Sequence, residues 1–253
     1  MTIDLELAVQ DLDGVLTARA VGATRVELCA ALGATGGITP SLGTIRVAVE
    51  TGLPVHVLVR PRPGSFVYTE DEAAVAEADI EAALRAGAAG VVVGALTPHG
   101  TIDARALARF VAAARDAAPH AEVTFHRAID TAIAGGNDPE GLLETLGHAG
   151  VDRILTSGGA TDWRHGLPVL RRLVAAAHSH VDRVEVMAGG GVRLGDLPTL
   201  LDAGVDAVHV SAKQSVNPSG VRAAPGQGLP DYESTDRVLA GRIAAALPLR
   251  TRA

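Results

Sequence analysis

One short pattern recurs along the chain and constrains its fold more than any other feature of the sequence. A run of apolar, β-branched residues follows a glycine or proline, and an alanine-rich amphipathic stretch follows the run. The clearest copies lie around Gly22, Gly87, Gly150 and Gly204. Each glycine stands where a helix needs a left-handed residue at its C-terminus, and each apolar run is typical of a strand buried on both faces. The pattern therefore predicts alternating helices and buried parallel strands.

Eight runs of this kind predict eight strands, which recur about every 30 residues. They are Ile3–Val9, Arg25–Cys29, Val55–Arg60, Gly90–Gly94, Glu122–His126, Arg153–Thr156, Arg183–Met187 and Ala207–Ser211. The clearest helical stretches are Asp71–Ala86, Asp103–Ala117, Trp163–Ala177 and, last, Thr235–Leu247. Eight strand–helix units predict an α/β fold, a (β/α)₈ TIM barrel that forms a single domain over residues 1–253. A doubly wound sheet is disfavoured because the first turn, Gln10–Gly14, lacks the dinucleotide-binding glycines.

The predicted barrel has one long connection, and the chain carries few signs of other partners. Residues 214–232 are rich in proline and glycine and are predicted to form a loop on the active face. A net charge of −7, with three Phe, two Tyr and one Trp, argues against a nucleic-acid surface. The apolar runs are too short for a membrane span. The single cysteine, Cys29, and the absence of a leader pattern favour a cytoplasmic protein.

Polar residues on the predicted strands point to a functional site. Side chains of a barrel strand alternate between the interior and the helix layer, so the parity opposite to the apolar residues faces inward. That parity holds Glu6, Glu27, His56, Arg60, His126, Glu185 and His209. Burying charges is costly unless they are paired, and polar residues at the C-terminal ends of barrel strands commonly belong to a site. The alternative is an ion-pair network, Arg60 with Glu27 and Glu185, that only holds the barrel together.

Turns after the last three strands predict an anion site. Glycine lets the backbone N–H groups approach an anion, and loops after strands seven and eight of such barrels often hold phosphate. The candidate residues are Ser157, Gly158, Gly159, Gly189, Gly190, Gly191, Ser211 and Lys213. Tight strand-to-helix turns would need the same glycines.

The segment Arg60–Tyr68 follows the third strand and carries Phe66 and Tyr68, which suit a lid, a plug or an oligomer contact.

Several longer motifs resemble the CutC family, which is named for copper homeostasis. They are Val26-Glu27-Leu28-Cys29, Gly36-Gly37-Ile38-Thr39-Pro40-Ser41, Pro54-Val55-His56-Val57-Leu58-Val59-Arg60-Pro61-Arg62, Gly64-Ser65-Phe66-Val67-Tyr68, Thr124-Phe125-His126-Arg127-Ala128-Ile129-Asp130, Leu155-Thr156-Ser157-Gly158-Gly159 and Met187-Ala188-Gly189-Gly190-Gly191. They span residues from about 3 to 213. The resemblance implies a barrel, a cytoplasmic location, a homo-oligomer and copper binding or handling. It also implies a pocket of Glu27, His56, Arg60, His126, Arg127 and Asp130, with Cys29 beside them.

These residues are compatible with two functions, metal binding and catalysis. Copper(I) prefers thiolate and thioether ligands, and the paired cysteines of copper-binding relatives are reduced here to Cys29, with His56 and His126 as the other candidate ligands. A harder divalent ion would suit the glutamates and histidines, among them Glu27 and Glu185. The alternative function is an enzyme that acts on a small anionic or phosphorylated metabolite. Its acid–base group would be His126 or His56, and Arg60 or Arg127 would clamp the anion.

Overall fold

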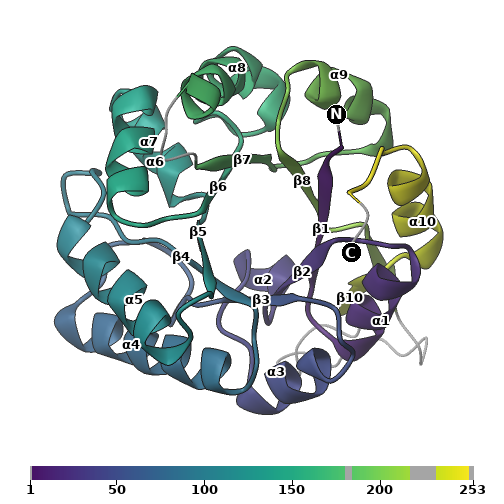
Figure 1. Cartoon of the computed structure of the whole chain (residues 1–253), viewed down its shortest axis with the longest axis horizontal. Coiled ribbons are helices and arrows are strands. Elements are labelled where there is room, and N and C mark those ends of the chain that lie inside the picture. The colour runs from purple at the N-terminus through teal and green to yellow at the C-terminus, as the bar shows by residue number, and fades with distance from the viewer. Residues whose placement is uncertain (1, 180–183, 217–231, 251–253) are drawn as a thin grey trace, which may run out of the picture.

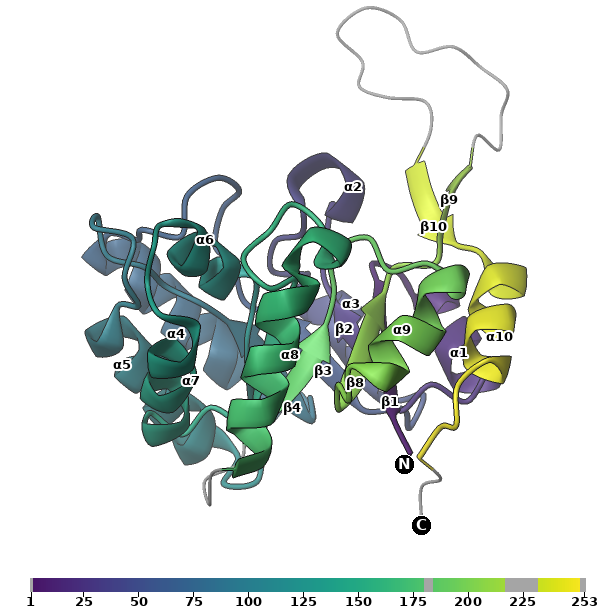
Figure 2. The same ribbon diagram turned by 90° about the horizontal axis from the view of Figure 1, so that it is seen from above.

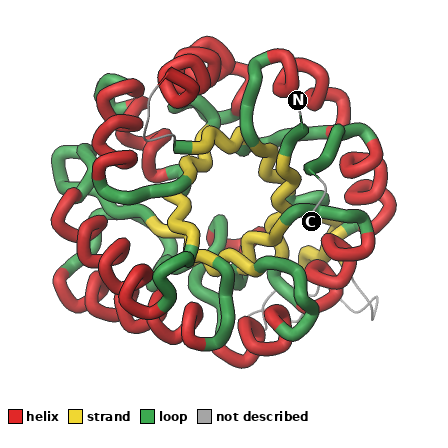
Figure 3. The backbone as a smooth tube through the Cα atoms, in the orientation of Figure 1, coloured by secondary structure: helices red, strands yellow, loops and turns green. Residues whose placement is uncertain are grey.

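Eight short parallel strands pair in chain order and close into a barrel, with β1 beside β8 (Figures 1 and 3). The computed structural model describes residues 2–179, 184–216 and 232–250. The strands are β1 (Asp4–Val9), β2 (Arg25–Leu28), β3 (Val55–Leu58), β4 (Gly90–Val93), β5 (Glu122–Phe125), β6 (Arg153–Thr156), β7 (Glu185–Ala188) and β8 (Ala207–Val210). The predicted (β/α)₈ barrel is confirmed, and each predicted strand lies within a few residues of an observed one.

Most of the helices ring the barrel and cover the outward face of its strands (Figure 1), whereas α2 lies at one end of the barrel (Figure 2). They are α1 (Leu12–Ala20), α2 (Leu32–Thr35), α3 (Leu42–Val49), α4 (Glu70–Arg85), α5 (Ala104–Ala117), α6 (Ala128–Ala134), α7 (Pro139–His148), α8 (Trp163–Ser179), the 3₁₀ turn Leu194–Asp196, α9 (Leu197–Asp202) and α10 (Arg237–Ala245). Their ends follow local chemistry: a capping box between Thr69 and Glu72 begins α4. Within the described ranges, no helix has both the length and the hydropathy that a membrane crossing needs.

Side chains along each strand alternate between two layers, one between the strands and the helices and one inside the barrel. Outward side chains such as Leu5, Leu7, Val57 and Val208 are buried against the helices and form the main hydrophobic core. The barrel interior instead holds two small apolar clusters, one around Leu58 and Val92 and the other around Leu155 and Met187. Polar side chains gather toward the two mouths of the barrel, among them Glu27 and His209 at one mouth and Arg25 and Arg153 at the other.

A small antiparallel sheet stands at the C-terminal end of the barrel. Its strands are β9 (Lys213–Val216) and β10 (Tyr232–Thr235), and Figure 2 places them at the same end as α2 and away from the N-terminus. The prediction of a continuous loop over 214–232 was wrong at both ends of that range, and residues 217–231 lie outside the described part. Both strands are short and polar, so they lack the apolar run on which the prediction of strands depended.

The turn after β6 touches the start of α8 through bare backbone. A Cβ atom added to Gly158 would overlap the carbonyl oxygen of Gly166, and one added to Gly166 would overlap that of Ser157. Gly158 also has a φ angle of +75°, which residues other than glycine rarely adopt. Two glycines from separate elements therefore set how closely α8 approaches the barrel.

Candidate functional site

A cavity of about 270 Å³ opens at the C-terminal ends of the strands. It collects many of the side chains singled out from the sequence, together with Phe66 from the loop after β3. The predicted residues that line it are Glu27, Arg60, His126, Arg127, Gly190, Gly191, His209, Ser211 and Lys213. They lie in or just after five different strands (β2, β3, β5, β7 and β8), so only the closed fold brings them together.

A line of three ionisable groups crosses β1 at the floor of this cavity. The register places Glu6 of β1 opposite His209 of β8 and Ala8 opposite Glu27 of β2. Nδ1 of His209 lies 2.8 Å from Glu6 Oε1, and its Nε2 lies 3.4 Å from Glu27 Oε2. The small side chain of Ala8 leaves the space in which His209 and Glu27 meet across β1. Glu6 is fully buried and accepts a second contact, 2.7 Å long, from Nε of Arg25.

The surroundings of these groups separate their pKa values. Burial raises the pKa of Glu27 to about 7; the positive charge of His209 opposes the shift and the negative charge of Glu6 adds to it. Burial alone would raise the pKa of Glu6, but the charges of Arg25 and His209 outweigh it and hold the pKa well below its ordinary value. Burial would lower the pKa of His209, yet its bond to Glu6 and the charges of both carboxylates raise it. Glu27 can thus change its protonation state near neutral pH.

Arg60 brings a positive charge to the cavity without a carboxylate partner in the described part of the chain. Its Nη1 donates to the carbonyl oxygens of Thr35 (3.1 Å) and Gly37 (2.9 Å), and its Nη2 donates to that of Gly64 (2.9 Å). The guanidinium carbon lies 5.1 Å from the centre of the Phe66 ring. Arg60 therefore ties two loops together at the mouth, and it leaves its charge unneutralised beside the cavity. The alternative network, Arg60 with Glu27 and Glu185, does not form.

His126 lies under Phe66, with ring centres 4.7 Å apart. Its Nδ1 accepts a hydrogen bond from the backbone N–H of Ala128 (3.1 Å), which places the remaining ring proton on Nε2. Burial, and then the charge of Arg60, lowers the pKa of His126 to about 3, so the ring is neutral. Its Nε2 is buried and has no partner within the described residues. His126 is thus a neutral hydrogen-bond donor in the wall of the cavity.

The turn after β6 does not offer its N–H groups to a ligand, because a carboxylate of the chain already occupies them. Asp130 in α6 accepts hydrogen bonds from the N–H groups of Ser157 (3.0 Å) and Gly159 (2.9 Å) and from the hydroxyl of Thr156 (2.5 Å). Nε of Arg127 also donates to Asp130 (2.7 Å). Asp130 thus occupies the N–H groups of Ser157 and Gly159, and the N–H of Gly158 donates to the Thr156 hydroxyl oxygen (2.9 Å), so the anion site predicted on these three residues is not open to a ligand.

The turn after β7 retains free donors at the cavity. Gly189 donates to the carbonyl of Thr156 (2.9 Å), whereas the N–H groups of Gly190 and Gly191 have no partner in the described ranges. A Cβ atom on Gly190 would lie 3.1 Å from Nη1 of Arg127, so this arginine runs along the turn. Lys213, in contrast, pairs with Glu233 at 2.6 Å in the β9–β10 sheet. Gly190, Gly191 and Arg127 form the part of the predicted anion site that the structure leaves open.

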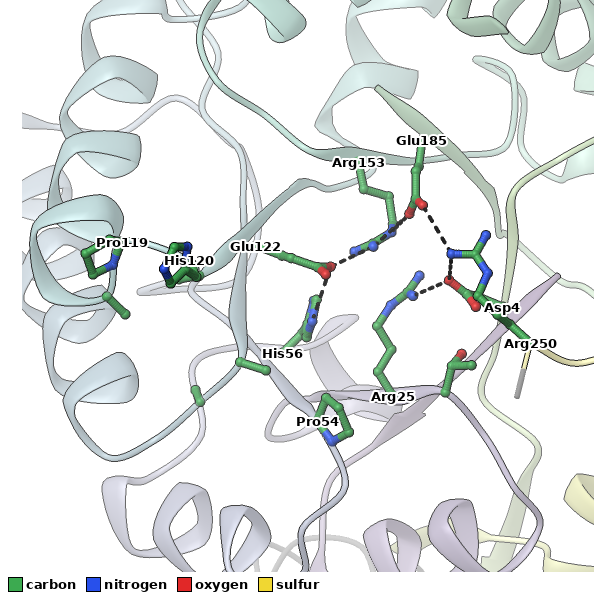
Figure 4. Close-up of a pocket in the computed structure, with 15 residues that line it drawn as sticks. Asp4, Arg25, Pro54, His56, Pro119, His120, Glu122, Arg153, Glu185 and Arg250 are labelled. Carbon is green, nitrogen blue, oxygen red and sulfur yellow. Dashed lines mark hydrogen bonds and ion pairs between the residues drawn. The ribbon is translucent and has the colours of Figure 1, made fainter. Parts of the chain in front are cut away.

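His56 and Glu185 do not belong to this cavity. Both line a second one, of about 620 Å³, at the N-terminal mouth of the barrel, where Nε2 of His56 lies 3.7 Å from Glu122 (Figure 4). His56 and Glu27 are paired in register on neighbouring strands. Because the strands of a barrel tilt, residues that are paired from strand to strand lie at different heights along the barrel axis, and they can therefore face opposite mouths. Glu185 is the first residue of β7, at its N-terminal end. The prediction that they share a pocket with Glu27 was wrong for this reason.

The predicted ligand set Cys29, His56 and His126 is not brought together. The donor atoms that converge in the described residues are those of Glu6, Glu27 and His209, all within 4.8 Å of one another. Cys29 is buried, its Sγ contacts the carbonyl oxygen of Val9 (3.5 Å), and burial, then the charge of Glu27, raises the pKa of its thiol. One buried thiol with a raised pKa does not fit copper(I), which prefers thiolates.

Sequence reasoning missed three interior residues, although the signal for them was present. Arg25, Glu122 and Arg153 share the inward parity of Glu27, Thr124 and Leu155 on their strands, so the same alternation identifies them. They stand at the first position of their strands, at the N-terminal mouth of the barrel, whereas we expected a functional site only at the C-terminal ends of the strands. Arg25 and Arg153 are buried, and both hold interior carboxylates.

Comparison with known proteins identifies the family. The model of the CutC family matches residues 3–214. The chain belongs to the CutC family. It is 42% identical over 209 residues to a CutC family protein of Salmonella schwarzengrund and 41% identical over 209 residues to one of Citrobacter koseri. Each alignment covers 82% of this chain and 79% of the relative.

A solved structure of the same family agrees with the fold. The crystal structure of the "putative copper homeostasis protein CutC" from Streptococcus agalactiae aligns with a TM-score of 0.73 and 30% identity, and the match covers 83% of this chain and 99% of that one. The tryptophan synthase A-subunit of Pyrococcus furiosus aligns with a TM-score of 0.57 and 16% identity, over 83% of this chain and 88% of that one. At that identity the second likeness concerns the barrel alone.

Proposed function

We propose that this CutC family member is an enzyme that transfers protons on a small anionic metabolite at the C-terminal mouth of the barrel. The observation that carries the proposal is the line Glu6–His209–Glu27, in which Glu27 titrates near pH 7 and opens into a cavity beside Arg60. Catalytic acids and bases need pKa values near the working pH, and a burial-shifted carboxyl in a cavity has that property. An ion-pair network that only stabilised the barrel would not need a carboxyl of this kind.

The anion of the substrate has a set of donors to receive it. Arg60 supplies an unneutralised charge, Arg127 supplies Nη1, and Gly190 and Gly191 supply backbone N–H groups. Backbone N–H groups and guanidinium donors are the usual partners of carboxylate and phosphate groups. A cavity of about 270 Å³ admits a metabolite of a few carbon atoms with one such group.

Two histidines and Glu27 then have distinct roles. Ionised Glu27 removes a proton from a carbon next to a carbonyl group, and becomes a neutral carboxyl. The developing negative charge on the carbonyl oxygen is stabilised by Nε2–H of His126, which is neutral, buried and without another partner in the described residues. His209, whose pKa is raised by its bond to Glu6 and by the charges of both carboxylates, orients the Glu27 carboxylate, and its positive charge favours the ionised form of Glu27. Return of the proton to the same carbon completes an exchange. Return to a neighbouring, hydroxyl-bearing carbon completes an isomerisation, in which the proton of that hydroxyl moves to the former carbonyl oxygen.

The test follows proton transfer directly and does not require the product to be known. The protein is incubated in D₂O with a panel of phosphorylated aldoses, phosphorylated ketoses and 2-oxo acids, and NMR measures deuterium incorporation next to the carbonyl. We expect one member of the panel to exchange, and we expect Glu27→Gln to slow that exchange by at least about 100-fold. Asp138→Asn, a surface carboxylate at the start of α7, is the matched control and should not change the rate. The absence of exchange with the whole panel, or an unchanged rate in Glu27→Gln, would refute the proposal.

A second candidate is copper handling, with the metal ion as cargo. The convergent donors of Glu6, Glu27 and His209 favour it, because oxygen and imidazole donors suit Cu²⁺ or Zn²⁺. Their use would require His209 to lose its proton, so binding would strengthen as pH rises. Calorimetry with CuSO₄ tests this: His209→Gln should weaken binding at least about tenfold and Cys29→Ala should not change it. Loss of binding in Cys29→Ala alone would assign copper to the cysteine instead.

A further inference from the structure

The N-terminal mouth of the barrel holds a cavity that the proposed chemistry does not use. It has a volume of about 620 Å³, and its floor is made of polar and charged side chains from β1, β2, β3, β5, β6 and β7 (Figure 4). They are Asp4, Arg25, His56, Glu122, Arg153 and Glu185. Alanine and proline residues, among them Pro54 and Pro119, line its sides. Part of the floor is buried, since Asp4 and Arg25 are only 6% and 4% exposed, whereas the side chains of Glu122 and Glu185 are 47% and 24% exposed. A partly buried charged floor under an apolar wall has the composition of a small-molecule site.

The guanidinium groups of the floor are already paired with groups of the protein. Arg25 donates to Glu6 (2.7 Å) and Asp4 (3.3 Å), and its third nitrogen contacts the sulfur of Met187 (3.4 Å). Arg153 donates to Glu185 (2.9 Å) and to the Thr124 hydroxyl (3.2 Å), and its third nitrogen donates to Glu122 (2.7 Å). Every side-chain nitrogen of both arginines is thus engaged. An anionic ligand would be repelled by these carboxylates, which already neutralise the charge of both arginines.

The floor of this cavity has more carboxylates than positively charged side chains. Three carboxylates, Asp4, Glu122 and Glu185, face two arginines, and burial together with those arginines lowers the pKa of His56 to about 3, so His56 adds no positive charge. Oδ1 of Asp4 is buried and has no hydrogen-bond partner within the described residues. A buried oxygen of this kind is costly unless a donor reaches it. The floor therefore lacks one positive charge and one hydrogen-bond donor.

Arg250 supplies part of the missing positive charge. It follows α10 near the C-terminus, and its Nη1 lies 3.6 Å from Asp4 and 3.9 Å from Glu185 (Figure 4). Both distances are longer than a hydrogen bond, and the side chain is 51% exposed. A guanidinium already lies between these two carboxylates, but it is loosely held and leaves Asp4 Oδ1 unsatisfied. Contacts of this length at an exposed arginine are worth at most about 1 kcal/mol.

We propose that the N-terminal mouth is a binding site for a small organic cation that carries a guanidinium or primary ammonium group, with Arg250 covering the site as a replaceable stand-in. The cation donates to Asp4 and Glu185, and its alkyl part packs on the alanine and proline wall. A metal ion fits less well, because the described residues bring three ligand atoms close together only at Glu6, Glu27 and His209. The site lies at the opposite mouth from the proposed proton transfer and does not depend on it.

Calorimetry with methylguanidine tests the proposal, and methylurea serves as its neutral counterpart of similar shape. At pH 7.5 and low salt we expect methylguanidine to bind and methylurea not to bind, because the floor requires a charge. Glu185→Gln should weaken binding at least about tenfold, since it removes one charged acceptor. Arg250→Gln should strengthen binding about twofold to fivefold, since it removes the competing guanidinium.

Surface variants provide matched controls for both changes. Arg171→Gln and Glu140→Gln remove exposed charges of α8 and α7 that pair with Asp202 and Arg172, and neither should alter the affinity by more than about twofold. If Glu185→Gln does not fold, as judged by circular dichroism, Asp4→Asn takes its place with the same expected loss. Equal binding of methylurea, no binding to wild type or to Arg250→Gln, or an equal effect of the surface variants would overturn the proposal.

Discussion

Replacement of Asp130 by alanine should be among the most destabilising single changes at the C-terminal end of the barrel. The Asp130 carboxylate is 6% exposed and accepts hydrogen bonds from the backbone of Ser157 and Gly159, the hydroxyl of Thr156 and Nε of Arg127. Alanine would leave all of these donors without their acceptor. The two buried backbone N–H groups would have no other partner, because the turn is too tight to rotate them toward water.

The expected magnitude follows from the number and kind of these bonds. A hydrogen bond to a charged group contributes about 1.5–3 kcal/mol, and the separate values do not add. Removal of one partner from a buried, hydrogen-bonded charge pair typically costs about 3–5 kcal/mol. At roughly 2–4 °C per kcal/mol for a chain of this size, Asp130→Ala should lower the melting temperature by about 10 °C. Asp130→Asn retains one acceptor oxygen and should lower it by a smaller amount.

Differential scanning calorimetry of both variants measures the effect, and Asp138→Ala is the control. Asp138 is an exposed carboxylate that caps α7 through a single bond to the N–H of Gly141 (2.9 Å), so its loss should cost about 1 kcal/mol. Formate at 100 mM should restore about 1 kcal/mol to Asp130→Ala if it fills the vacated position with a Kd of about 20 mM. A loss in Asp130→Ala no greater than that in Asp138→Ala would contradict the role given to this carboxylate.

Three further predictions concern ionisation in the barrel. Glu27 binds a proton more tightly in the folded than in the unfolded chain, so its contribution to stability is lost as pH rises through about 7; Glu27→Gln should therefore gain in melting temperature relative to wild type between pH 5 and pH 8. His126 has a lowered pKa, so its contribution is lost as pH falls from about 6.5 toward 3, and His126→Gln should lose less stability over that range in urea titrations. Cys29 is a buried thiol with a raised pKa, and mass spectrometry should find it alkylated by iodoacetamide at pH 8 at least about 100-fold more slowly in folded than in unfolded protein.

The barrel was predictable from the sequence because its signal is repeated. Each glycine stop and apolar run carries weak information, but eight copies at a regular spacing leave few other folds. The strands β9 and β10 carry no such signal: Lys213–Val216 and Tyr232–Thr235 are polar, and they pair with each other rather than with the barrel. Strand propensity read from the sequence identifies a strand that is buried, because such a strand is apolar. It says little about a polar strand that pairs with another strand at the surface.

The site was predictable in its residue types but not in its grouping. Strand parity correctly sent Glu27, His56, Glu185 and His209 to the interior. It could not assign each of them to one mouth, because that depends on the tilt and stagger of the strands, which no single strand encodes. The use of Asp130 as an internal anion was also hidden, because it joins residues 27 positions apart through hydrogen bonds that only the folded turn creates.

The bare contact between Gly158 and Gly166 affects how any mutational survey of this protein should be interpreted. Either position, changed even to alanine, would push α8 away from the barrel and move the turn that carries Ser157 with it. Both glycines would then score among the most sensitive positions in a screen for activity. Their sensitivity would record a distance between two elements rather than contact with a ligand, and intolerance to substitution is a poor guide to chemistry at this end of the barrel.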